Sequence, residues 1–141
     1  MNEEFASSNA NHCFVCGPGN PIGLGVRFEI EDGVCVGHFT PGPNHVGWDD
    51  TTHGGILFSA LDDVMANWLF LQGAVGVTAR CDLRYRAQVK VGTPLRLEGR
   101  LVRKRGRLCE LEGKALDAAS GDTLVEAQAR FMIMDPGPLA D

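Results

Sequence analysis

The chain has 141 residues, of which 44% are hydrophobic, so it is long and apolar enough to form one globular domain with its own core. Its formal net charge of -5 argues against a protein that holds nucleic acid or an anionic membrane by overall charge. The sequence contains no apolar run of about 18 residues, and its N-terminal segment is polar, which predicts a cytoplasmic protein without a membrane span or signal peptide.

The chain begins with a segment that has neither helical nor strand periodicity. Residues 1–22 are rich in Asn, Ser, Gly and Pro, and we expect an arm there, followed by a folded domain over residues 23–136 and a tail over residues 137–141. Residues 24–30 and 34–39 alternate apolar and polar side chains around an Asp32-Gly33 turn, which predicts a β-hairpin. Residues 40–52 contain prolines, glycines and aspartates and are predicted to be a loop of functional length.

Only one segment, from residue 54 to about residue 71, has the spacing of an amphipathic helix. Its apolar residues recur at steps of three and four, namely Ile56, Leu57, Ala60, Leu61, Val64, Met65 and Trp68. Four strands are predicted after it, over residues 77–87, 95–104, 107–117 and 123–134. This order predicts an α+β fold in which an antiparallel sheet of about five to six strands wraps around one long helix. Because one helix covers only one face of such a sheet, we expect a homodimer or homotetramer.

The chain has five cysteines, which cannot all pair with one another, so we expect reduced thiols. Cys13 and Cys16 have the spacing of a zinc knuckle. A closed zinc site needs four ligands and the sequence offers no second such pair, so a metal would have to recruit His12, another histidine or a partner chain. We predict no metal and no other cofactor, and interpret the pair as reactive or structural cysteines, with metal binding as the alternative.

Two glycines, Gly54 and Gly55, open the predicted helix directly after His53. Glycine is a poor helix former, and two explanations are open. The glycines can allow a sharp turn into the helix, or they can let a ligand approach the free N–H groups of the first turn, where a developing oxyanion would be stabilised.

Helical phase distinguishes the two neighbouring aspartates. Asp63 shares its row with Ser59 and Asn67 and is interpreted as part of a polar stripe. Asp62 shares its row with Phe58 and other apolar residues, which disfavour a charge, so we expect a functional carboxylate there. The alternative is a carboxylate satisfied by a neighbouring backbone or hydroxyl group.

His53 and Asp62 are nine residues apart, which places them roughly 13 Å apart along a helix axis and on opposite sides of it. They cannot meet within one chain. If both line one pocket, that pocket combines the helix start of one subunit with Asp62 of another.

Several of these features together resemble the hot-dog-fold thioesterases, particularly the phenylacetate-degradation type. They are His45-x-x-Trp48, His53-Gly54-Gly55, the carboxylate nine positions after that histidine, Thr78 in the next strand, and the turn at residues 91–95. The resemblance covers nearly the whole chain. It implies an acyl-CoA or related acyl-thioester hydrolase whose site forms across a dimer interface.

Carried over by position, the resemblance makes Asp62 the nucleophile or the general base. It implies that the Gly55 N–H polarises the thioester carbonyl, that His53 orients the thioester, and that Thr78 assists the water or the carboxylate. A histidine at a helix start is otherwise an ordinary cap, and a threonine in a strand needs no function. Substrate contacts are further assigned to His45, Trp48 and Gly54.

Coenzyme A is a polyanion, so the acidic chain needs local cations to bind it. Arg80 and Arg84 alternate along one predicted strand together with Thr78, and we assign them to substrate binding. Solvated strand faces are the alternative for most of the basic residues.

Three other functions compete with hydrolysis. A non-catalytic acyl-CoA-binding module of the same fold has no need for a carboxylate beside a neutral acyl chain. A hydratase or dehydratase would place aspartate and histidine on a short spacing, unlike His53 and Asp62. A redox or metal protein would be built on Cys13 and Cys16.

Overall fold

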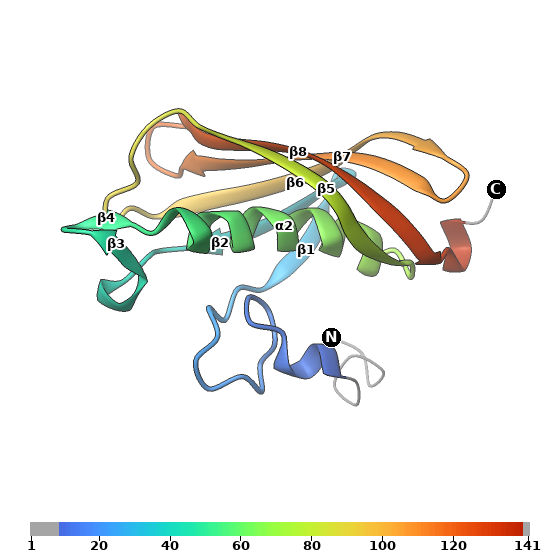
Figure 1. Cartoon of the computed structure of the whole chain (residues 1–141), viewed down its shortest axis with the longest axis horizontal. Helices are drawn as coiled ribbons and strands as arrows, with labels where there is room; N and C mark the ends of the chain where they lie inside the picture. Colours follow the sequence, from blue (N-terminus) through green and yellow to red (C-terminus); the bar gives the residue numbers. More distant parts are fainter. Residues whose placement is uncertain (1–8, 140–141) are drawn as a thin grey trace.

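The computed structural model describes residues 9–139, in which a long helix crosses one face of a six-stranded antiparallel sheet (Figure 1). The sheet order is β1-β2-β6-β7-β8-β5. The elements are η1 (Asn9–His12), β1 (Phe28–Glu31), β2 (Val34–Phe39), η2 (Pro43–His45), β3 (Val46–Trp48), β4 (Thr51–Thr52), α2 (Gly54–Phe70), β5 (Val75–Tyr85), β6 (Leu95–Arg105), β7 (Leu108–Asp117), β8 (Thr123–Asp135) and η3 (Gly137–Leu139). The predicted α+β architecture is confirmed.

The first hairpin forms at the predicted turn but is shorter than the alternation suggested. Asp32 and Gly33 both have positive φ, 50° and 80°, as a two-residue hairpin turn requires. β1 nevertheless begins only at Phe28. The residues before it pair with the arm instead, since the Leu24 N–H donates to the Phe14 carbonyl (2.8 Å) and the Val26 N–H to the Val15 carbonyl (2.9 Å). The alternating pattern there reflects packing against the arm, which carries Val15 into the core.

The predicted loop over residues 40–52 contains one turn of 3-10 helix and a small hairpin, β3–β4. Strands of two and three residues are too short for periodicity to detect. The hairpin is tied to the segment after β5, because the Thr52 N–H donates to the Val89 carbonyl and the Val91 N–H to the Asp50 carbonyl, both at 2.8 Å. These bonds fix the entry of the chain into α2.

The core lies between α2 and the inner face of the sheet. Gly99 of β6 faces Gly113 of β7 beneath the helix, and a Cβ added at Gly99 would lie 2.6 Å from the Val64 carbonyl oxygen. The two glycines therefore let α2 lie close to the central strands. The largest fully buried side chains around this contact are Leu61, Met65, Leu69, Leu95, Leu97, Leu111, Phe131 and Ile133.

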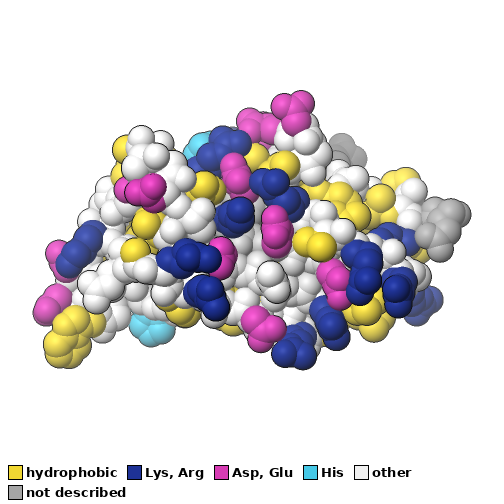
Figure 2. All heavy atoms as spheres, turned by 90° about the horizontal axis from the view of Figure 1, so that it is seen from above, with side chains coloured by type: hydrophobic (Ala, Val, Ile, Leu, Met, Phe, Trp, Pro, Cys, Tyr) yellow, Lys and Arg dark blue, Asp and Glu magenta, His cyan; other side chains and the backbone are white. Residues whose placement is uncertain are grey.

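The outer face of the sheet carries interspersed basic and acidic side chains (Figure 2). Many of them form ion pairs between or along strands, such as Arg96 with Glu98 (2.8 Å) and Arg86 with Glu126 (2.8 Å). This face is solvated, as expected for most of the basic residues. Among residues 9–139, no helix is both long and apolar enough to cross a membrane. All five cysteines are free thiols, as predicted.

Candidate active site

Asp62 lies near the middle of α2, at the edge of the sheet formed by β5. Its Oδ1 accepts a hydrogen bond of 2.6 Å from the Thr78 hydroxyl. No hydrogen bond within residues 9–139 uses Asp62 Oδ2, so that oxygen is free to meet a water molecule or a carbonyl carbon. Asp62 is half-buried, and Phe58, one turn earlier, is 38% exposed. Met65 and Leu69, farther along the same row, are fully buried, so Asp62 lies where the row passes from the surface into the core.

A β-bulge explains how Thr78 reaches the helix. Thr78 pairs with the buried Phe131 of β8 and Arg80 pairs with the exposed Arg130, so Ala79 is an extra residue between the two pairs. The bulge turns Thr78 toward the inner face and the following arginines toward the outer face. The prediction that Thr78 shares a face with Arg80 and Arg84 is wrong, because a regular alternation was assumed.

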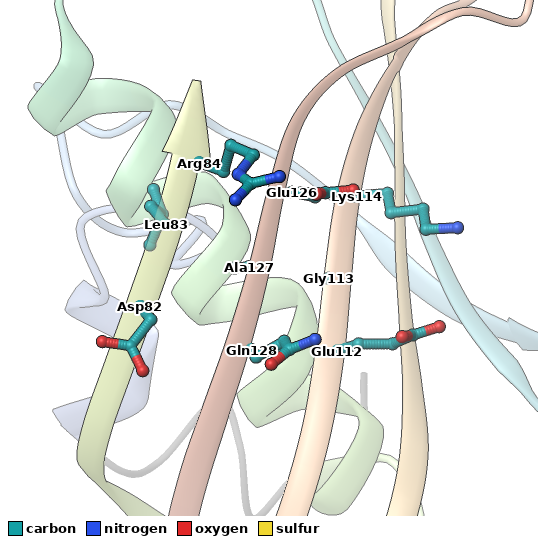
Figure 3. A pocket seen from close by; sticks show the side chains of 9 residues that line it. All are labelled: Asp82, Leu83, Arg84, Glu112, Gly113, Lys114, Glu126, Ala127 and Gln128. Atoms are coloured by element: carbon teal, nitrogen blue, oxygen red, sulfur yellow. The ribbon is translucent and has the colours of Figure 1, made fainter. Parts of the chain in front are cut away.

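Arg84 lines a hollow of about 360 Å³ on the outer face of the sheet (Figure 3). There it lies over Glu126 of the neighbouring strand, with Lys114 beyond it. Arg80 is paired with Asp82 at 3.3 Å and is largely exposed. The structure therefore brings neither arginine to Asp62 within one chain, and their contact with substrate stays a prediction.

His53 is the N-cap of α2, and its Nδ1 accepts a 2.8 Å hydrogen bond from the Gly55 N–H. A neutral imidazole that accepts at Nδ1 carries its proton on Nε2, so the exposed side of the ring presents a donor. The capping explanation of His53 is thus confirmed. The Gly55 N–H, predicted to polarise a carbonyl, is already engaged, and a substrate oxygen would have to take it over from His53.

Tyr85, the only tyrosine of the chain, contacts the start of α2, and sequence reasoning missed this contact. Its hydroxyl donates to the Gly54 carbonyl at 2.8 Å, which ties the end of β5 to the start of α2. A Cβ at Gly54 would lie 3.3 Å from the Tyr85 hydroxyl oxygen, so a larger residue there would push this hydroxyl back by a few tenths of an ångström. A hollow of about 340 Å³ opens beside Gly54 and Tyr85. The alternating pattern of the strand did not indicate that Tyr85 contacts Gly54.

His45 and Trp48, predicted to bind substrate, have different surroundings. His45 Nδ1 accepts a 2.8 Å hydrogen bond from the Gly42 N–H, and its ring packs 5.4 Å from that of Phe39. Trp48 is 76% exposed on the small hairpin. Within residues 9–139, no hydrogen bond links either residue to Asp62, and their contact with substrate also stays a prediction.

Asp63 points away from Asp62, toward the arm. Cys13 Sγ lies 3.6 Å from its Oδ1, and the Asn67 side chain donates to its Oδ2 at 3.1 Å. Burial, with the nearby Cys13 and Asp62 charges, raises the pKa of the Asp63 carboxyl to about 7. Asp63 shares a polar stripe with Asn67, as predicted, and the arm lies against that stripe at Cys13.

An antiparallel sheet wrapped around one long helix is the architecture of the hot-dog fold. The family model of the thioesterase superfamily matches residues 50–126, more than half of the chain. The chain therefore belongs to the thioesterase superfamily. The matched region contains α2, β5, β6 and β7 and lies wholly after the arm.

Solved structures give the same result for the fold. A thioesterase superfamily protein superposes with a TM-score of 0.80 at 29% identity over 86% of this chain, which spans only 60% of that protein. A hypothetical thioesterase from Streptococcus pneumoniae, solved with coenzyme A, gives 0.72 at 20% identity, covering 78% of this chain and 89% of that one. The E. coli PaaI protein from the phenylacetic acid degradation operon gives 0.72 at 18% identity, covering 77% and 83%. No curated protein sequence matches the chain.

Proposed function

We propose that the chain hydrolyses acyl-CoA or a related acyl thioester, with Asp62 as the reacting carboxylate. The observation that carries this proposal is the hydrogen bond from Thr78 to Asp62 Oδ1, which orients the carboxylate and leaves its second oxygen open. An ordinary surface aspartate has no need of a bulge that turns a hydroxyl toward it. Family membership supports the same reaction class.

The reaction can follow either of two routes, with Asp62 as nucleophile or as general base. In the first, Asp62 attacks the thioester carbonyl carbon, the carbon–sulfur bond breaks to release a thiolate, and water then hydrolyses the acyl anhydride. In the second, Asp62 takes a proton from water, the hydroxide attacks the carbonyl carbon, and the thiolate leaves. In both, the Gly55 N–H stabilises the oxygen that becomes negative, once His53 Nδ1 releases it.

A second copy of the chain completes the site in this proposal. β5 is an edge strand of eleven residues whose outer edge is unpaired within residues 9–139, and Val77 on it is 51% exposed. Its Thr78 end lies at Asp62 and its Tyr85 end lies at Gly54. If two β5 strands pair in antiparallel fashion, the Tyr85 end of each lies beside the Thr78 end of the other. The helix start of one subunit then approaches Asp62 of its partner.

The solved structures offer two further points of support. The Streptococcus pneumoniae protein was solved with coenzyme A, and a Streptococcus mutans protein with acetyl-CoA. Alanine variants of the Streptococcus pneumoniae protein at one aspartate and one threonine were also solved, and those positions are sixteen residues apart, the spacing of Asp62 and Thr78. For this chain we propose that Arg80 and Arg84 contact the coenzyme A phosphates from the outer side of the edge strand.

The proposal is tested by thiol release from a panel of aliphatic and aromatic acyl-CoA esters, measured alongside their binding. We expect catalytic release of coenzyme A, and the best ester identifies the acyl preference. If the esters bind at micromolar concentration and no thiol is released, the chain is a non-catalytic acyl-CoA-binding module and the hydrolase proposal is wrong.

Replacing Thr78 by valine is expected to lower kcat about 10- to 100-fold, because a hydrogen bond to a charged group is lost while the side-chain shape is kept. Thr78→Ser retains the hydroxyl and is expected to recover most of the activity. Steady-state kinetics of both variants check this. Equal activity of the valine and serine variants would show that the hydroxyl does not position Asp62.

A further inference from the structure

We propose that Cys13, Cys16 and Asp63 bind one zinc-type divalent cation, with a water molecule as the fourth ligand. Its two cysteines lie outside the region matched by the thioesterase family, whereas Asp63 lies within it, next to the carboxylate that we propose reacts. Two of its residues come from the arm and the third from the middle of α2. Their ligand atoms, two Sγ and one carboxylate oxygen, all lie within 4.8 Å of one another.

The distances suit a tetrahedral ion. With a zinc–sulfur bond of about 2.3 Å and a zinc–oxygen bond of about 2.1 Å, a sulfur and an oxygen ligand lie about 3.6 Å apart. Cys13 Sγ is 3.6 Å from Asp63 Oδ1. An ion can therefore enter between these ligands with little movement of either residue.

Asn67 holds one carboxylate oxygen of Asp63, Oδ2, and leaves Oδ1 available to a metal ion. Asn67 donates to Asp63 Oδ2 at 3.1 Å and to the Asp63 carbonyl at 2.9 Å, and its amide nitrogen lies 3.8 Å from Cys16 Sγ. This is the arrangement in which a neighbour that is not itself a ligand orients the ligands of a metal. Asp63 forms no ion pair within residues 9–139, so no lysine, arginine or histidine compensates its charge there.

The arm is held in place without a metal, which favours binding because little has to be ordered. The Gly17 N–H donates to the Cys13 carbonyl at 2.9 Å and closes the turn between the cysteines. Backbone bonds from Leu24 and Val26 hold Phe14 and Val15, the two residues inside that turn. The two thiols are thus presented to α2 by a loop that backbone hydrogen bonds hold in place.

The donor set selects the kind of ion. Two thiolates favour a soft or borderline cation such as zinc over magnesium or calcium, which prefer oxygen ligands. Three protein ligands leave one tetrahedral position open, and a hollow of about 140 Å³ beside the cluster, bordered by Ala66, Phe70 and Gly76, has room for a water molecule. The ion would fasten the arm to the helix one residue away from Asp62.

The test uses the full chain without a histidine tag, purified under reducing conditions. Elemental analysis is expected to find about one zinc per chain, or the metal-free protein is expected to bind one Co²⁺ per chain with a thiolate-to-cobalt absorption band. Asp63→Asn and Cys13→Ser are expected to lower the affinity for Co²⁺ at least about 10-fold. Asp62→Asn and Cys81→Ser are the matched controls, one for the neighbouring carboxylate and one for a half-buried thiol outside the cluster, and both should retain the metal.

Two results would overturn the proposal. One is wild-type protein with free thiols that neither contains nor takes up zinc or cobalt in stoichiometric amount. The other is cobalt binding that is unchanged in Asp63→Asn, which would remove the carboxylate from the site. The zinc content and the cobalt uptake of the wild type can be measured even if a cysteine variant does not fold. Neither measurement depends on thioesterase activity.

Discussion

Replacing Asp62 by asparagine is expected to lower kcat for thioester hydrolysis by about 100- to 10,000-fold, because the amide can neither attack the carbonyl nor accept a proton from water. The amide still accepts the hydrogen bond from the Thr78 hydroxyl, so the local structure is expected to persist. Thiol release from the best acyl-CoA ester measures the effect, and binding of the same ester to the variant shows that the pocket is intact.

Asp63→Asn is the matched control for this variant, since it changes the adjacent carboxylate on the same helix. Asp63 faces the arm and not the Thr78 edge, so this variant is expected to keep kcat within about tenfold of wild type. If Asp63→Asn loses activity and Asp62→Asn keeps it, the assignment of the reacting carboxylate is wrong. Thermal unfolding of both variants excludes a general loss of structure.

Replacing Gly55 by proline is expected to lower kcat by about 100- to 1,000-fold, the usual effect of losing one donor to a developing oxyanion. Proline has no N–H, and it is tolerated in the first turn of a helix. Gly54, which precedes it, has no Cβ, so the clash that proline makes with the preceding residue is reduced. The measurement is kcat with the same ester, with circular dichroism as a check on the helix.

Gly55→Ala keeps the N–H and is the control for this substitution. An added Cβ would lie 3.0 Å from the His53 ring, so the ring has to shift slightly, and we expect a decrease of less than about tenfold. Equal losses in the proline and alanine variants would mean that the ring position matters and the N–H does not.

The parts of the fold that depend on periodicity were predictable from the sequence. Helix α2 and strands β6, β7 and β8 appear within a few residues of their expected bounds, because each buries one regular face against the same core. The Asp32-Gly33 turn was also predictable, since positive φ restricts the residues that can occupy it. Local pattern and turn chemistry agree with the tertiary structure at all of these places.

The errors in the predicted site have two physical causes. A single inserted residue, Ala79, reverses the faces of β5, and no local pattern announces such a bulge, so Thr78 was grouped with Arg80 and Arg84. The contact of Asp63 with the arm was missed because helical phase describes one helix alone, and only the tertiary fold places the arm cysteines against Asp63. The Tyr85 contact with Gly54 was missed for the same reason.

The proposal that Gly55 of one subunit and Asp62 of its partner form one active site is tested most directly with a hybrid of two inactive variants. Asp62→Asn and Gly55→Pro chains, each carrying a different affinity tag, are expressed together, and the hybrid dimer is purified through both tags in turn. If Gly55 of one subunit and Asp62 of the other form each site, one of the two sites in the hybrid contains both intact residues. The hybrid is then expected to show about half of the wild-type rate of thiol release. A hybrid as inactive as its two parents would contradict the account, because each site would then lie within a single chain.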